Sequence, residues 1–187
     1  RWSTTWRDYQ ASLAARDAQL LSAVPEGYPR ALWASLDLSI GRAQQDAASR
    51  DVLLVLGQAA TAPLPEARLR GAARRLGYGQ LAIARALSRL AHLGLVETRD
   101  QLRMHGLVRE RVRALGADAG DAKRALCTEL VEHFDARLGE TQTAGAEQVR
   151  RIQDELHALA PHLEAVRDAH SSDGSAVYVL GALADRK

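Results

Sequence analysis

The sequence contains little that could be cross-linked or inserted into a membrane. Its 187 residues include one cysteine, one methionine and one phenylalanine, and aromatic residues make up only 4%. The single cysteine, Cys127, cannot form an internal disulfide, which fits a reducing compartment. No apolar run reaches the roughly 20 residues that a membrane-spanning helix needs, and no signal-peptide pattern opens the chain. We therefore expect a cytoplasmic protein without membrane contact.

The short motifs that mark common active sites are also missing. The chain has no GxxxxGK[ST] phosphate loop, no aliphatic run ending in two aspartates, no HExxH pair and no Cys/His cluster. Two of its six histidines, His157 and His162, are five residues apart, which places them on different faces of a helix. We expect neither a metal site nor catalytic activity in this chain.

Positive charge is concentrated in the middle of the chain. The formal net charge is only +2, but residues 66–113 hold eleven arginines against four acids, a difference of seven. Such a stretch is a candidate anion-binding surface. Because the chain opens on Arg1 and not on methionine, we also expect it to be a piece of a longer protein.

Hydrophobic spacing predicts a mainly α-helical fold in three units. Apolar residues at intervals of three and four predict helices over residues 2–23 and 29–45, within a first helical domain at 1–45. Residues 46–115 are expected to form a second domain and residues 116–187 a third.

The second unit has the order of a winged helix. Helices are predicted over 51–60, 66–77 and 80–93, with an aspartate or serine before the first and Gly94 ending the third. The segments 95–100 and 101–105 alternate in polarity and predict a two-stranded wing. A closing helix follows over 106–115, whose residues Val108, Val112 and Leu115 are expected to point inward.

The third unit predicts two long helices after a flexible joint at 116–121. The first, over 122–138, carries Leu126, Leu130, Phe134 and Leu138 on one side. The second, over 147–169, carries a narrow seam of Val149, Ile152, Leu156, Leu159, Leu163 and Val166. We favour packing of this seam within the chain over a coiled-coil dimer. Pro161 should kink this helix or start a new one, and residues 176–187 read as an unfinished helix.

One use of a winged helix is DNA binding, through the helix that follows the tight turn. The arginines available for it are Arg74, Arg75, Arg85 and Arg89. The helix after the turn, predicted over 80–93, has only Gln80 and Ser88 as short polar residues of the kind that read bases. A DNA-binding transcriptional regulator therefore remains an alternative, and a plain helical protein–protein scaffold is another.

The order of segments resembles a known family. "LWASLDLSI", "DVLLVLGQAATAP" and "LSRLAHLGLVETRDQLRMHGLVRERVRA" resemble the helical and winged-helix portion of STAND-class signalling ATPases, the NB-ARC group of plant resistance proteins and bacterial regulators. "LHALAPHLEAVRDA" resembles the segment that leads into tetratricopeptide-like repeats in bacterial members. The resemblance covers roughly Trp6 to Ala169 and rests on the order of its elements.

The resemblance implies a role for His105. "MHGLVRERVR" is similar to the family's MHD element, whose histidine contacts the β-phosphate of bound ADP and keeps the protein inactive. An imidazole at a helix N-terminus, where unpaired N–H groups gather, suits such a contact, and the apolar Met104 and Leu107 should anchor the junction so that the ring points outward. The family's aspartate is Gly106 here, which weakens the parallel. The simpler alternative is a histidine that caps or packs the helix without a ligand.

The resemblance also implies partners and cofactors. The chain would be an autoinhibitory switch that lends His105 to ADP held by an upstream nucleotide-binding domain, and that controls oligomerisation and signalling in defence or transcription regulation. ADP or ATP with Mg²⁺ would belong to the parent protein, and this segment alone would hold none. Its helical repeats would bind protein partners or further copies.

Overall fold

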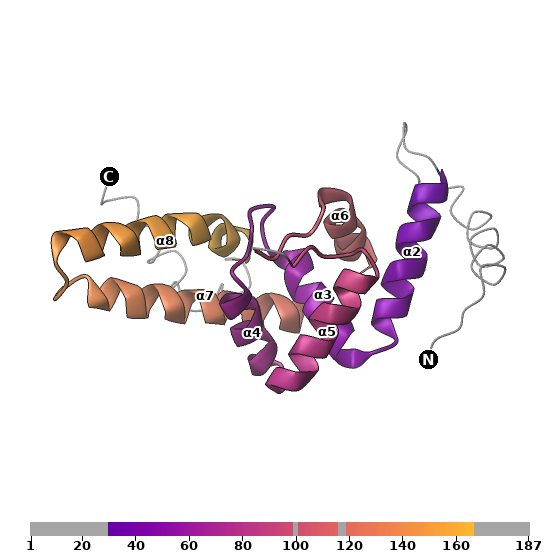
Figure 1. Ribbon diagram of the computed structural model, residues 1–187, viewed down its shortest axis with the longest axis horizontal. Helices are drawn as coiled ribbons and strands as arrows, with labels where there is room; N and C mark the ends of the chain where they lie inside the picture. The colour runs from indigo at the N-terminus through magenta and orange to yellow at the C-terminus, as the bar shows by residue number, and fades with distance from the viewer. Residues whose placement is uncertain (1–29, 99–100, 116–118, 167–187) are drawn as a thin grey trace.

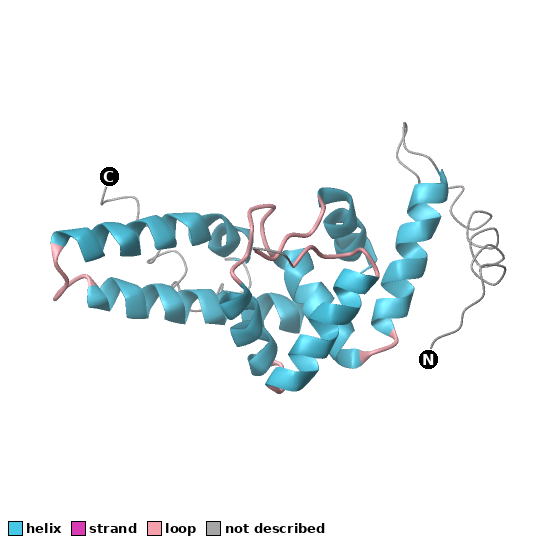
Figure 2. Cartoon of the chain, viewed as in Figure 1, coloured by secondary structure: helices cyan, strands magenta, loops and turns pink. Residues whose placement is uncertain are grey.

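The computed structural model describes residues 30–98, 101–115 and 119–166. The described residues form seven helices and contain no strand, so the protein is mainly α-helical (Figures 1 and 2). The helices are α2 (Arg30–Gln44), α3 (Ala47–Gln58), α4 (Glu66–Arg75), α5 (Gln80–His92), α6 (Gly106–Leu115), α7 (Gly120–Glu140) and α8 (Ala146–Val166). The helices expected over residues 2–23 and 176–187 lie outside the described residues.

Helix α3 lies at the centre and packs against α2, α4, α5, α6 and α7. Apolar residues on most of its surface are buried, as the sequence predicted: Val52, Leu53, Val55 and Leu56. The helix begins at Ala47, four residues before the expected start. The Asp46 carboxylate accepts a hydrogen bond from the Ser49 amide at 2.8 Å, so an N-cap earlier in the chain sets the boundary.

Helices α4 and α5 form the next two elements as predicted. The stripe of Ile83, Leu87 and Leu90 on α5 is buried. Gly94 follows the helix with a φ of 69°, the left-handed conformation that ends many helices. The C-terminal signal read from the sequence is therefore confirmed.

The segments expected to form a wing make isolated contacts. Glu97 and Arg103 exchange two backbone hydrogen bonds of 2.9 and 3.0 Å, and Leu64 bonds to Leu102 at 3.1 Å. Both pairs are antiparallel bridges, and neither extends into a strand among the described residues. Residues 99–100, at the expected turn between the two segments, lie outside the described part.

Helix α6 has the predicted bounds, but one inward residue was predicted wrongly. Val108 and Val112 are buried, whereas Leu115 is 41% exposed. Helix α3 ends at Gln58, and Arg113 of α6 already bonds to the carbonyls at that end. Leu115 therefore lies past the contact between α6 and the end of α3.

Helices α7 and α8 lie side by side (Figure 1), and each has 21 residues. The seam residues of α8 are buried from Ile152 to Val166, which confirms packing within the chain. Pro161 starts no new segment, because α8 continues past it to Val166. Part of the joint expected at 116–121 is also helical, since α7 begins at Gly120.

One hydrophobic core joins these elements. It includes residues from Ile40 on α2 to Val166 on α8, with Phe134 among its largest fully buried side chains. Helix α7 packs on both α3 and α4. Glu129 of α7 accepts hydrogen bonds from Arg68 at 2.9 Å and from Arg75 at 3.3 Å, which fixes this packing at its edge.

Gly57 allows α3 and α6 to approach closely, and it provides a test of this packing. A Cβ added there would lie 2.6 Å from Cγ1 of Val112, whose branched side chain cannot turn away freely. We expect Gly57→Ala to lower the free energy of unfolding by about 1–2 kcal/mol, measured by chemical denaturation. Gly139→Ala is the control, because no atom lies within 4 Å of the added Cβ. Equal stability of the two variants would contradict the close approach.

Candidate functional site

His105 lies immediately before the first residue of α6, on the surface of the described fold. Its neighbours hold the backbone on both sides, because Met104 is 5% exposed and Leu107 packs against the cluster of Trp33 and Ala34. The His105 ring is exposed, as the sequence analysis expected. A ligand outside this fold can therefore reach it.

The first turn of α6 fixes the orientation of the His105 ring. The Leu107 amide donates a hydrogen bond to Nδ1 at 3.2 Å, so the ring acts as an N-cap. In the neutral ring, a nitrogen that accepts leaves the proton on the other nitrogen. Nε2–H is then the donor that remains for a ligand. The first turn of α6 contains no acidic residue, so the partial positive charge of the helix end is not offset there.

Gly106, which stands where the family pattern has an aspartate, is sterically open. A Cβ added at this position would meet nothing within 4 Å. Packing therefore does not require glycine here, and a longer side chain could be introduced beside His105. This makes the departure from the family pattern testable by substitution.

Helix α6 is tied to α2 by a buried ion pair. Arg111 donates from Nε and Nη2 to the two carboxylate oxygens of Asp37, at 2.6 and 2.8 Å. The guanidinium also lies 5.6 Å from the centre of the Trp33 ring, within cation–π range. The paired geometry raises the pKa of Arg111, chiefly through its hydrogen bonds to Asp37. These contacts hold the helix that begins beside His105.

Helix α6 is tied to the C-terminus of α3 by Arg113. Its Nε donates to the Gly57 carbonyl at 2.7 Å, and its Nη2 donates to the carbonyls of Gln58 at 3.3 Å and Ala59 at 3.1 Å. The last carbonyls of a helix have no partner within the helix and carry partial negative charge. One arginine thus caps α3 and positions α6 at the same time.

The arginines named for DNA binding do not form one available surface. Arg74 and Arg85 are exposed. Arg75 forms ion pairs with Glu129 and Glu132, and these hydrogen-bonded partners raise its pKa against the opposing effect of burial. Arg89 donates from Nη2 to the Arg42 carbonyl at 2.8 Å. Two of the four guanidiniums are therefore engaged in contacts within the fold.

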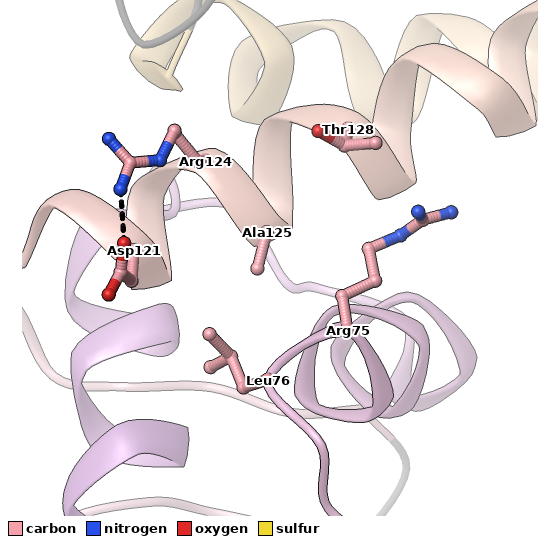
Figure 3. Close-up of a pocket in the computed structure, with 6 residues that line it drawn as sticks. All are labelled: Arg75, Leu76, Asp121, Arg124, Ala125 and Thr128. Atoms are coloured by element: carbon pink, nitrogen blue, oxygen red, sulfur yellow. Dashed lines mark hydrogen bonds and ion pairs between the residues drawn. The ribbon is translucent and has the colours of Figure 1, made fainter.

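A pocket of about 440 Å³ lies between the end of α4 and the start of α7 (Figure 3). Arg75, Leu76, Asp121, Arg124, Ala125 and Thr128 line it. The dashed line in Figure 3 joins Arg124 to Asp121, and Arg75 is held by its two glutamates. Both guanidiniums of the pocket are thus paired with carboxylates, which offset much of the positive charge that an anion would meet there.

Sequence reasoning missed the role of His162, which it considered only as a metal ligand. The side chain is 0% exposed and connects α8 to the loop between α3 and α4. Its Nδ1 accepts a hydrogen bond from the Ala60 amide, and Nε2 contacts the Pro63 carbonyl, both at 3.2 Å. Burial lowers the pKa of His162, so the ring is held neutral with its proton on Nε2. Its position three residues after Leu159 on the buried seam was the available signal.

His133, whose role sequence reasoning also missed, belongs to a second contact between α7 and α8. Its Nε2 lies 2.8 Å from Glu155, which also accepts hydrogen bonds from Arg137 at 2.6 and 3.0 Å. Burial is the largest effect on His133 and lowers its pKa. The two histidines therefore serve helix packing in different places.

Metal binding and membrane insertion are two further functional classes to consider for the described residues. Within the residues that the structure describes, no three His, Cys, Asp or Glu side chains gather as a metal site would require. No described helix combines the length and hydrophobicity needed to cross a membrane. Comparison with protein-family models, curated proteins and solved structures found no match for this chain. Function is therefore inferred from the geometry around α6.

Proposed function

We propose that this chain is the regulatory segment of a STAND or NB-ARC-type ATPase. In this proposal, residues 46–115 form a winged-helix unit that lends His105 to the β-phosphate of ADP held by an upstream nucleotide-binding domain. ADP would keep the unit closed, and exchange for ATP would release it and permit oligomerisation. Such an element needs only a few kcal/mol of difference in contacts to change state.

The observation that carries the proposal is the placement of the His105 ring. The ring is exposed, and its Nδ1 is engaged by the Leu107 amide. The remaining Nε2–H donor lies at a helix N-terminus that has no acidic residue in its first turn. A neutral donor beside a positive helix end suits a phosphate oxygen.

The order of contacts around α6 supports a winged-helix unit. Three helices, α3, α4 and α5, are followed by the pairing of Glu97 with Arg103 and then by α6. Leu64, between α3 and α4, pairs with Leu102 as a third short segment of such a wing would. The hairpin of α7 and α8 would then begin the helical repeat region, which we propose as the surface for protein partners or further copies.

DNA binding receives less support than nucleotide sensing. The helix that would read DNA, α5, is exposed at Leu81 in its first turn, where polar base-reading side chains would be needed. Arg75 and Arg89 are engaged within the fold. The remaining exposed arginines would bind DNA mainly through phosphates, without sequence preference.

The test is the rate at which the full-length parent protein releases ADP. Loss of a hydrogen bond to a charged phosphate costs about 1.5–3 kcal/mol, so His105→Ala should speed release by roughly 10–100-fold. Gly106→Asp should fit sterically, because the site is open to a longer side chain, and should weaken ADP retention, because its carboxylate would offset the positive end of α6. His92→Ala, another exposed histidine on the same unit, is the matched control. ADP release that is unchanged by His105→Ala would overturn the proposed contact.

A further inference from the structure

Arg109, in the middle of α6, is a buried cation without a hydrogen-bond partner at two of its nitrogens. The residue is 5% exposed, and its Nε and Nη1 contact no acceptor. Buried charges in proteins are normally paired, because removing a guanidinium from water costs several kcal/mol unless acceptors replace the water. Arg109 therefore points to an acceptor that the described fold does not supply.

The carbonyls that end α3, and one in the loop that follows it, accept hydrogen bonds from side chains other than Arg109. Arg113, one turn further along α6, bonds to the three carbonyls that end α3. The Pro63 carbonyl lies opposite Nε2 of His162. The closeness of these groups is visible in their electrostatics: burial and then the Arg113 charge lower the pKa of Arg109, and the Arg109 charge contributes to lowering the pKa of His162.

Among the described residues, no acidic side chain is recorded as acting on the Arg109 guanidinium. The one acid on α6, Glu110, is exposed on the next position of the helix, which faces a different direction. The other arginines of α6 are engaged, Arg111 with Asp37 and Arg113 with the end of α3. Arg109 alone on this helix has a guanidinium whose donors at Nε and Nη1 remain unused among the described residues.

We propose that Arg109 is the receptor for one oxyanion, a carboxylate or a phosphate, that binds where α6 meets the C-terminus of α3. Both groups are acceptor-only anions whose oxygens match the donors of a guanidinium. The low local dielectric that makes the unpaired cation costly also makes its pairing strong. Because little of the side chain is exposed, binding requires the covering side chains to move and should be slow. The proposal rests on the unpaired donors of Arg109 and does not depend on the proposed function.

The test is thermal unfolding of the 187-residue chain in sodium phosphate, sodium acetate or sodium chloride at equal ionic strength. Phosphate also raises Tm by a general solvent effect, so each anion is compared between wild type and Arg109→Met. At about ten times the dissociation constant, specific binding should raise the wild-type Tm by about 3–6 °C beyond the shift in Arg109→Met. Arg103→Met, which removes an exposed arginine, should keep the full shift. Arg109→Lys, which keeps the charge and loses the fork of donors, should show a reduced one.

Comparing the anions distinguishes a carboxylate ligand from a phosphate ligand. A specific shift with both anions indicates that a carboxylate suffices, whereas a shift with phosphate alone indicates a phosphate group. In chloride, Arg109→Met should have a Tm equal to or above that of wild type, because the variant removes an uncompensated buried charge. The proposal is wrong if wild type and Arg109→Met respond equally to both anions. It is also wrong if Arg109→Met unfolds in chloride, since the guanidinium would then have a partner within the fold.

Discussion

Replacing Arg111 with methionine is expected to lower the free energy of unfolding by about 3 kcal/mol. The substitution keeps most of the apolar stem and removes the fork that binds Asp37 through two hydrogen bonds. The two side chains are only 15% and 9% exposed, so Asp37 would be left as a buried carboxylate without its partner. Breaking one side of a buried pair typically costs about 3–5 kcal/mol, and slight exposure places this pair at the lower end. Urea denaturation measures the change.

A matched control distinguishes burial from ion pairing as such. Arg124 and Asp121 form an ion pair of the same residue types, but their side chains are 64% and 76% exposed. Arg124→Met should therefore change stability by less than about 0.5 kcal/mol, as exposed ion pairs usually contribute little. Adding Asp37→Asn to Arg111→Met should recover part of the loss, because the stranded charge is removed. Similar losses of stability in Arg111→Met and Arg124→Met would contradict a stabilising role for the buried ion pair between α2 and α6.

Stability should fall steeply when the pH drops below about 6.5, and His162 should account for much of the fall. Its pKa is lowered in the folded state, mainly by burial, whereas the unfolded chain takes up a proton near 6.5. Between the folded and unfolded pKa values the unfolded state binds more protons, so the free energy of unfolding decreases as pH falls. The limiting slope is about 1.4 kcal/mol per pH unit for each such group. His133, whose pKa is also lowered, adds to the same trend.

Variants separate the contribution of His162 from that of the other histidines. His162→Phe keeps a ring but cannot titrate, so its stability should depend less on pH between 7.5 and 5. It should also be less stable than wild type at pH 7.5, because the Ala60 amide and the Pro63 carbonyl lose their contacts. His157 is exposed, and His157→Gln should retain the wild-type dependence. A pH profile of His162→Phe that is as steep as that of wild type would exclude His162 as the main acid-sensitive group.

Local sequence signals were sufficient where an element depends on its own residues. The stripe on α5, the seam on α8 and the left-handed Gly94 were all predicted from spacing and residue type. Prediction failed where a neighbouring helix decides whether a side chain is buried. Leu115 has the spacing of an inward residue, but α3 ends too early to cover it. Of the two outcomes expected at Pro161, a new helical segment is excluded, because α8 continues past it.

Some features of the candidate site could also be predicted from the sequence, and others required the structure. That His105 would stand exposed at the start of a helix followed from the apolar residues around it, Met104 and Leu107. Which ring nitrogen caps the helix, and which remains for a ligand, required the position of the Leu107 amide. The four arginines named for DNA binding were equivalent in the sequence. The partners of Arg75 and Arg89, Glu129 and Arg42, lie 54 and 47 residues away in the chain.

The sequence by itself determined the helices, because a helix needs only hydrogen bonds within its own segment and an apolar stripe whose spacing is visible in the residues. Only the tertiary structure decided which charges are paired. Arg109 and Arg111 are two residues apart on α6 and chemically identical, yet Arg111 meets Asp37 and Arg109 has two nitrogens without an acceptor. The reason is that a charge is satisfied by groups brought together from distant parts of the chain, and no local pattern specifies that meeting.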